Sequence, residues 1–213
     1  MLTKRILSAL VLAPLALAAV WIGSWAFAAL VGAGAALAAW EWTRLCGWSP
    51  FWVAAGIVYI GLPVAALLWL REQDHGRATA FWLLLVVWAT DSMAYAAGRL
   101  IGGWKLVPSI SPNKTWAGLG GGVVGAALMG ALVGLAVDAD VLLLAVAGAA
   151  LALIAQGGDL MESAIKRRFG AKDSGKLIPG HGGLLDRVDG LMTAAPAAAA
   201  MCLAAGGGIA SWP

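Results

Sequence analysis

The stretch GDLMESAIKRRFGAKDSGKLIPGHGGLLDRVDG, residues 158–190, is the most highly charged part of this chain. It holds six of the 14 basic residues and five of the 11 acidic residues, together with a histidine and several glycines. The chain around it is apolar, since 62% of the 213 residues are hydrophobic. Charges near a membrane core are costly, so a dense mixture of acids and cations indicates a polar function. We interpret this stretch as the active site.

Seven hydrophobic segments surround the charged stretch, and two of them run into it from either side. A mean hydropathy of +0.86 and only 12% charged residues place the chain in the membrane class. Each segment is long enough to cross a bilayer, and each must be helical because lipid offers no partner for open backbone groups. The predicted spans are residues 6–22, 24–40, 51–70, 79–98, 115–137, 141–158 and 188–210. We therefore predict an all-α, polytopic transmembrane bundle, with N-terminal membrane helices in residues 1–78 and a catalytic membrane domain in residues 79–213.

The basic residues of the loops fall on one side of the membrane if seven spans alternate in direction. An excess of Lys and Arg in short loops marks the cytoplasmic side. These residues are Lys4, Arg5, Arg44, Arg99, Lys105, Lys114 and the cluster at residues 166–187. The charged stretch is thus expected to face the cytoplasm. Nucleic-acid binding is not expected, because the basic residues lie beside acids and hydrophobic spans and form no basic patch.

The small and sulfur-containing residues of the spans predict packing rather than chemistry. The fifth span carries pairs of glycines four residues apart, such as Gly118 with Gly122 and Gly130 with Gly134. This spacing predicts close helix packing, within the chain or between subunits. Cys46 and Cys202 have no metal-ligand spacing and are expected to be buried free thiols.

The first half of the charged stretch predicts one polar face of a helix. If the sixth span continues as a helix, Asp159, Glu162, Ser163 and Lys166 lie at i, i+3, i+4 and i+7. A carboxylate at the depth of Asp159 is expensive unless a cation accompanies it. Two interpretations remain open: a bound metal ion, or a salt bridge with Lys166 or Arg187.

The segment PGHGGLLDRVD, residues 179–189, leads the chain back into the membrane. Its proline and glycines prevent a helix before residue 184 or 185, and glycines let a phosphate approach the backbone N–H groups. Asp186 and Asp189 would meet Asp159 across a pair of helices. Carboxylates from two helices suit Mg²⁺ when phosphates complete its shell. His181 is a candidate contact to a phosphate or base, or a structural loop residue.

A second polar segment, WATDSMAYAAGRLIGGWKLVPSISPNKTWAG, lies at residues 88–118. Asp91, Tyr95 and Arg99 share one helical face at the end of the fourth span. Ser111, Lys114 and their neighbours lie in a loop broken by prolines, before a helix N-terminus that favours anions. The alternative for Asp91 is an intramembrane ion pair with Arg99.

One competing motif is excluded by its context. GAKDSGK, residues 170–176, imitates a phosphate-binding P-loop, but Leu177 stands where Ser or Thr is needed. A predicted helix precedes the motif, whereas a P-loop follows a strand. Lys172 and Lys176 remain candidates for phosphate binding as point charges.

The sequence SAIKRRFGAKDSGKLIPGHGGLLDRVD, residues 163–189, resembles the signature of the phosphatidate cytidylyltransferase (CDP-diacylglycerol synthase) family. The segments DSMAYAAGRLIGG and SPNKTWAG, which begin at residues 91 and 111, are also similar to that family. The similarity covers roughly residues 85–195. The chain departs from the usual SPxKTWEG pattern at Ala117, so the role of that glutamate is not carried over.

The resemblance implies a membrane enzyme that joins CTP and phosphatidate to give CDP-diacylglycerol and pyrophosphate, with Mg²⁺ required. It implies that Asp159 and Asp186 bind the metal, and that a monovalent cation such as K⁺ accompanies it in some members. It also implies a homodimer in the cytoplasmic (inner) membrane of a bacterium.

We assign two groups of candidate site residues. The catalytic candidates are Asp159, Asp186, Lys166 and Arg187, which would bind metal and neutralise phosphate charge. The substrate-binding candidates are Asp91, Tyr95, Arg99, Ser111, Lys114, Arg167, Lys172, Asp173, Lys176, His181, Gly182, Gly183 and Asp189. Two alternatives are a transporter, with Asp91 and Asp159 in an ion pathway, and a CTP-dependent transferase or kinase acting on another membrane lipid.

Overall fold

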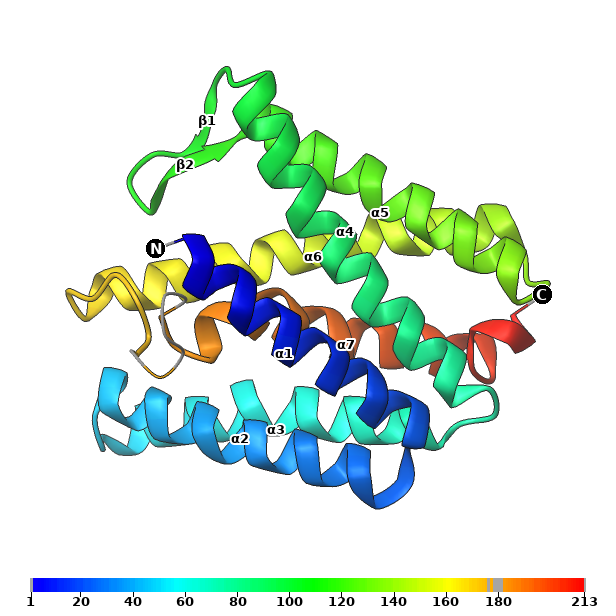
Figure 1. The fold of residues 1–213 in the computed structure, drawn as a ribbon. Coiled ribbons are helices and arrows are strands. Elements are labelled where there is room, and N and C mark those ends of the chain that lie inside the picture. Colours follow the sequence, from blue (N-terminus) through cyan, green and yellow to red (C-terminus); the bar gives the residue numbers. More distant parts are fainter. Residues whose placement is uncertain (1, 176, 178–181, 213) are drawn as a thin grey trace.

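The computed structural model describes residues 2–175, 177 and 182–212, with side chains from residue 10 onward. Over these residues the chain forms seven α-helices, one two-stranded sheet and a short C-terminal 3₁₀ helix (Figure 1). The elements are α1 (Leu2–Ile22), α2 (Ser24–Cys46), α3 (Pro50–Glu72), α4 (Gly76–Leu100), β1 (Lys105–Val107), β2 (Ser111–Thr115), α5 (Trp116–Ala136), α6 (Val141–Arg168), α7 (Leu185–Ala205) and η1 (Ile209–Ser211).

The helical membrane fold predicted from the sequence is confirmed. Six helices, α2 to α7, are long and apolar enough to cross a membrane. In α1 the apolar segment that can be described is the shorter Leu10–Ile22, so a first span stays a prediction. The predicted last span, residues 188–210, falls within the candidate span Leu185–Ser211, in which α7 ends at Ala205 because Gly206 adopts a left-handed conformation with φ of 79°.

The loops rich in basic residues all lie at one end of the bundle. Figure 1 shows the N-terminus, the turn between α2 and α3, the β1–β2 hairpin and the loop before α7 at this end, and the C-terminus at the other. The helices alternate in direction, as the sequence predicts. The charged stretch and the second polar segment are therefore carried to the same surface.

The β1–β2 hairpin was not predicted, since the sequence favoured an irregular loop between two helices. β1 and β2 are antiparallel, with Lys105 opposite Thr115 and Val107 opposite Ser111. Pro108 lies in the turn, where its fixed φ is compatible with the reversal of the chain. Thr115 then caps α5, because its side chain accepts a hydrogen bond of 3.0 Å from the Gly118 N–H. This hairpin fixes where Lys114 points.

Close contact between α4, α5 and α6 depends on small residues. A Cβ added at Gly130 of α5 would meet the Leu144 carbonyl oxygen of α6, and one at Gly121 would meet the Ala97 side chain of α4. These glycines of α5 thus pack against α4 and α6 of the same chain. The sequence left open packing within the chain or between subunits, and for these contacts the first applies. Tight approach of backbones is how membrane helices associate without a hydrophobic driving force.

The buried core joins α4, α6 and α7. Its largest side chains include Trp82, Leu83 and Leu151, each 0% exposed. Alanines of α7 fill the space between these larger residues. Cys46 and Cys202 are both buried free thiols, as predicted. The packed half of the bundle supports α6 and α7, which carry most of the candidate site residues.

Candidate active site

The polar face predicted for the end of the sixth span exists. α6 continues as one 28-residue helix through Asp159 to Arg168, about ten residues beyond the predicted span. The Ser163 hydroxyl donates to Asp159 Oδ1 over 3.3 Å, and Lys166 Nζ lies 3.1 Å from Glu162 Oε1. Glu162, Ser163 and Lys166 are buried, at 1%, 9% and 6% exposure. Lys166 of this face pairs with Asp186 of α7, whereas the Asp159 side chain is 34% exposed.

Asp186 is the most heavily hydrogen-bonded acid of the charged stretch. Its Oδ1 lies 2.6 Å from Lys166 Nζ, and its Oδ2 accepts a 2.8 Å bond from the Gly183 N–H. The Ser174 N–H donates to both oxygens, at 3.1 and 3.0 Å. Asp186 stands in the first turn of α7, where the helix dipole favours a negative charge. The carboxylate therefore joins α6, α7 and the connecting loop.

Asp159 is held by the other polar segment. Its Oδ2 lies 2.6 Å from Lys114 Nζ, and that ammonium also donates to the Gln156 carbonyl over 3.4 Å. The Asp159 side chain is 34% exposed. In the described part of the chain Asp159 forms its ion pair with Lys114 of the hairpin, whereas Lys166 pairs with Glu162 and Asp186. The two segments form one site, and each of the two predicted metal-binding acids has a lysine.

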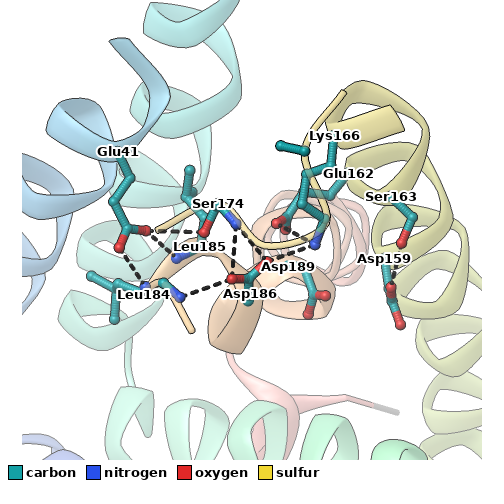
Figure 2. Close-up of polar contacts among 12 residues, drawn as sticks. Glu41, Asp159, Glu162, Ser163, Lys166, Ser174, Leu184, Leu185, Asp186 and Asp189 are labelled. Carbon is teal, nitrogen blue, oxygen red and sulfur yellow. Dashed lines mark hydrogen bonds and ion pairs between the residues drawn. The ribbon is translucent and has the colours of Figure 1, made fainter. Parts of the chain in front are cut away.

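Asp189 lies between these two acids. Figure 2 shows it on α7, with Asp186 on one side and Asp159 of α6 on the other. Its Oδ1 accepts a 2.7 Å hydrogen bond from the Gly190 N–H. The sequence prediction that Asp186 and Asp189 face Asp159 across a helix pair therefore agrees with the arrangement of the side chains.

The helical face at the end of α4 is present but more open. Tyr95 and Arg99 are exposed, and Arg99 Nη1 donates to the Tyr95 hydroxyl over 2.9 Å. Asp91 is also exposed, and within the described residues no ion pair joins it to Arg99. Ser111 is half-buried in β2. The structure brings Lys114 of this segment against Asp159, whereas Tyr95 and Arg99 bond to each other.

The remaining cations lie around the rim of the site. Arg167 is exposed and ties α6 to the hairpin turn, with Nε donating to the Ile110 carbonyl over 3.3 Å. Lys172, Asp173 and Arg187 are exposed as well. Gly182 has a φ of 87°, a conformation that favours glycine. Lys176 and His181 lie outside the described residues, so both assignments stay predictions.

One site residue was missed at the sequence level. Glu41 of α2 is 1% exposed, and its carboxylate accepts hydrogen bonds from the Leu184 and Leu185 N–H groups and the Ser174 hydroxyl (Figure 2). The predicted span ended at residue 40, so Glu41 counted as a loop residue. The signal that was available is that an acid directly follows an apolar run on the same side of the membrane as the charged stretch.

The acids offer a donor set that suits a hard cation. Carboxylate oxygens are the ligands that Mg²⁺ prefers, and the buried Glu162 Oε2 has no hydrogen-bond partner in the described part of the chain, whereas Oε1 faces Lys166 Nζ at 3.1 Å. Among the described residues no three His, Cys, Asp or Glu side chains surround one point. The protein would then supply few ligands and leave the others to phosphate and water, as is usual for Mg²⁺. Asp159 and Asp186 would be the ligands of such an ion, which would have to replace the lysines that each carboxylate contacts at 2.6 Å in this structure.

An apolar cavity of about 600 Å³ extends to the start of α7, where Arg187 and Val188 line it. It is bounded by α1, α2, α3, α4 and α7, and its few polar lining residues include Ser92 and Arg187. Its size is within the range of roughly 300–1,000 Å³ typical of small-molecule sites. A cavity of this kind accommodates an apolar chain while its charged end stays near Arg187.

The candidate site residues lie in a region of the chain that is similar to known proteins. A sequence model of the group described as the cytidylyltransferase family matches residues 3–51 and 46–205. The chain is 48% identical over 149 residues to a phosphatidate cytidylyltransferase of Brucella abortus, a match that covers 68% of this chain and 54% of that protein. The chain thus spans about half the length of this relative.

Two further relatives are matched over more of their length. The chain is 36% identical to a phosphatidate cytidylyltransferase of Rickettsia felis, over 90% of this chain and 88% of that protein. It is 35% identical to one of Pseudomonas aeruginosa, over 98% of this chain and 99% of that protein. All three relatives are bacterial, and the region that the family model matches includes both polar segments.

Proposed function

The chain belongs to the cytidylyltransferase family, and from this premise we propose that it is an integral membrane enzyme that transfers the cytidylyl group of CTP to phosphatidate. The products would be CDP-diacylglycerol and pyrophosphate. The observation that carries the proposal is the convergence of Asp159, Asp186, Lys114 and Lys166 from two polar segments, inside a region that the family model matches. The printed names of the relatives support the same activity.

The chemistry requires charge neutralisation more than proton transfer. A phosphate oxygen of phosphatidate attacks the α-phosphorus of CTP, a new P–O–P bond forms, and the α–β bond breaks as pyrophosphate leaves with its electron pair. The attacking oxygen is already anionic at neutral pH, so no strong general base is needed. The site must align two polyanions and stabilise the charge that develops between them.

The residues divide this work between ion binding and phosphate binding. Asp159 and Asp186 would hold Mg²⁺, which supplies Lewis-acid neutralisation of the phosphates, and a monovalent ion such as K⁺ is part of the same proposal. Lys114 and Lys166 hold the two carboxylates in place, at 2.6 Å each. Arg167, Lys172 and Arg187 are exposed and would contact CTP and the lipid phosphate. Gly182 and Gly183 would admit a phosphate beside the backbone.

The cavity beside Arg187 is the proposed position of a lipid chain. Its apolar wall matches an acyl chain, and each buried methylene stabilises the bound lipid by about 0.8 kcal/mol. Ser92 and Arg187 line the same cavity, near the level of the acids. The phosphatidate phosphate would then lie between Arg187 and the α4 residues Asp91 and Arg99.

The wider arrangement is also part of the proposal. Residues 79–213 would carry the catalytic groups, while the N-terminal helices of residues 1–78 complete the lipid cavity. The clustering of basic loops at one end of the bundle supports a cytoplasmic active site in a bacterial inner membrane. A homodimer is proposed from the family resemblance alone.

The experiment is a substrate panel with the purified protein. Labelled CTP and Mg²⁺ are combined with phosphatidate, diacylglycerol or a polyprenol in mixed micelles, with and without a chelator. We expect labelled lipid with phosphatidate only, and none once the metal is chelated. Label in the polyprenol or diacylglycerol sample would instead indicate a kinase or related transferase. Formation of labelled lipid from no acceptor would contradict the proposal.

A further inference from the structure

Glu41 lies in α2, far in the sequence from the charged stretch of residues 158–190, yet its side chain is buried against that stretch. We propose that Glu41 is a positioning residue that holds the loop before α7 in the conformation that presents Asp186. The inference rests on the proposed function, because Asp186 is assigned there as an ion-binding group. Glu41 is not among the candidate site residues assigned from the sequence.

Three hydrogen-bond donors, from Ser174 and from the start of α7, bond to the Glu41 carboxylate. The Leu184 N–H donates to Oε1 over 2.9 Å, and the Leu185 N–H donates to Oε2 over the same distance. The Ser174 hydroxyl donates to Oε2 over 3.2 Å. A carboxylate that is 1% exposed needs such partners, since burying a charge without them is costly.

These bonds supply a cap that α7 lacks in its own sequence. The first N–H groups of a helix have no partner within the helix, and Ser, Thr, Asp or Asn usually accepts from them. At α7 the N-cap residue is Leu184, which makes no side-chain cap. Glu41 replaces that cap from another helix, and its charge also suits the positive end of the helix dipole.

The loop is shaped to admit the Glu41 side chain. A Cβ added at Gly175 would lie 2.6 Å from Glu41 Oε1, and one at Gly183 would lie 2.6 Å from Glu41 Oε2. The Gly183 position would also collide with the Ser174 hydroxyl. At Gly175 and Gly183, two glycines of the charged stretch, the absence of a side chain thus makes room for Glu41, in addition to any phosphate contact.

Glu41 and Asp186 share the same short run of loop residues. Ser174 donates its hydroxyl to Glu41 and its N–H to Asp186. Gly183 donates to Asp186, and the next two N–H groups donate to Glu41. Figure 2 shows the two carboxylates on either side of this run. A change at Glu41 therefore shifts the groups that fix Asp186, without touching a substrate.

The test replaces Glu41 by glutamine, which keeps its size but turns one acceptor oxygen into a donor. Glu72→Gln is the matched control, since Glu72 is an exposed acid at the end of α3. Three properties are measured in detergent: the melting temperature, kcat and KM with CTP and phosphatidate, and amide hydrogen exchange of peptides that contain residues 174 and 183–185.

We expect Glu41→Gln to lower kcat by about tenfold or more, because bonds to a charged acceptor are lost. KM for CTP should change less than threefold, and exchange at residues 174 and 183–185 should accelerate while the middle of α2 and α7 keeps its protection. Ser174→Ala should lower kcat less, and the double variant should lose less than the product of the two single effects. Glu72→Gln should leave all readouts unchanged.

Unchanged kcat and unchanged exchange in Glu41→Gln would overturn the proposal. So would a loss of folded protein in both Glu41→Gln and Ser174→Ala, or multiplicative effects in the double variant, since either outcome makes Glu41 a general stability residue. The exchange measurement needs no substrate. If the wild type shows no transfer at all, the proposed function fails, while the exchange result still decides whether Glu41 anchors the loop.

Discussion

Lys166→Met tests whether the buried charges of the site are coupled as the structure indicates. Lys166 Nζ lies 2.6 Å from Asp186 Oδ1 and 3.1 Å from Glu162 Oε1, and its side chain is 8% exposed. Methionine keeps the length of the side chain but leaves two buried acids without their cation. Breaking a buried ion pair by removing one partner costs about 3–5 kcal/mol. In a chain of this length each kcal/mol corresponds to roughly 2–4 °C, so the melting temperature should fall by about 10 °C.

The assay is thermal unfolding of the purified protein in detergent, followed by tryptophan fluorescence. Lys172→Met is the control, because Lys172 is an exposed cation of the same stretch and should shift the melting temperature little. Adding Glu162→Gln to Lys166→Met should recover part of the loss, since one of the two unpaired charges is then removed. A fall of less than about 2 °C for Lys166→Met, equal to that of the control, would refute the assignment of Lys166 as the shared cation.

Three further variants test the packing and the two polar segments. Gly130→Leu should sharply reduce the yield of folded protein, because the new side chain must enter the space of the Leu144 backbone. Gly120→Leu is the control and should fold normally, since a Cβ at Gly120 has nothing within 4 Å. Equal yields of the two variants would contradict the packing. Lys114→Met should lower turnover by about tenfold or more, because Asp159 loses its ion-pair partner. Lys114→Arg keeps the positive charge and should retain more activity than Lys114→Met. The reverse order of activities would count against an ion pair. Arg99→Ala should raise the phosphatidate concentration needed for half-maximal rate, while the CTP dependence stays the same. Tyr95→Phe, which removes the hydroxyl that Arg99 contacts, should have a milder effect. A change in the CTP dependence alone would refute a lipid-side role of Arg99.

Much of the fold follows from local patterns in the sequence. Apolar runs of membrane length and the positions of basic loops predict the helices and their alternation, because a bilayer permits few other structures. The Gly and Pro residues before Leu185 correctly predict where α7 begins. α6 continues beyond residue 158, which was assumed for the sequence interpretation, and Asp159, Glu162 and Lys166 therefore share one face as expected.

Contacts between distant segments were harder to predict. Helical spacing suggested Lys166 or Arg187 as partners for Asp159, but the β1–β2 hairpin places Lys114 there. The hairpin itself has only a few residues in each strand, and prolines at 108 and 112 argue against strands in general. Tertiary contacts decide both features, and local propensity does not contain them.

Glu41 is a second residue whose contacts local sequence patterns do not predict. Its charge lies at the end of an apolar run, where a single acid is unremarkable in a sequence. Only the packing of α2 and α3 beside α7 brings it to the Leu184 and Leu185 N–H groups. The missing cap at Leu184 is visible in the sequence, since no Ser, Thr, Asp or Asn precedes Leu185 directly. At α7, an acceptor from another segment takes the place of the missing local cap.

The position of the label in the product tests the central claim most directly. Purified protein is given phosphatidate and Mg²⁺ with CTP labelled at either the α- or the γ-phosphate, and lipid and aqueous products are separated. Cytidylyl transfer predicts that the α label enters the lipid and the γ label leaves in pyrophosphate. Entry of the γ label into the lipid, or of neither label, would contradict the assignment of this site to cytidylyl transfer.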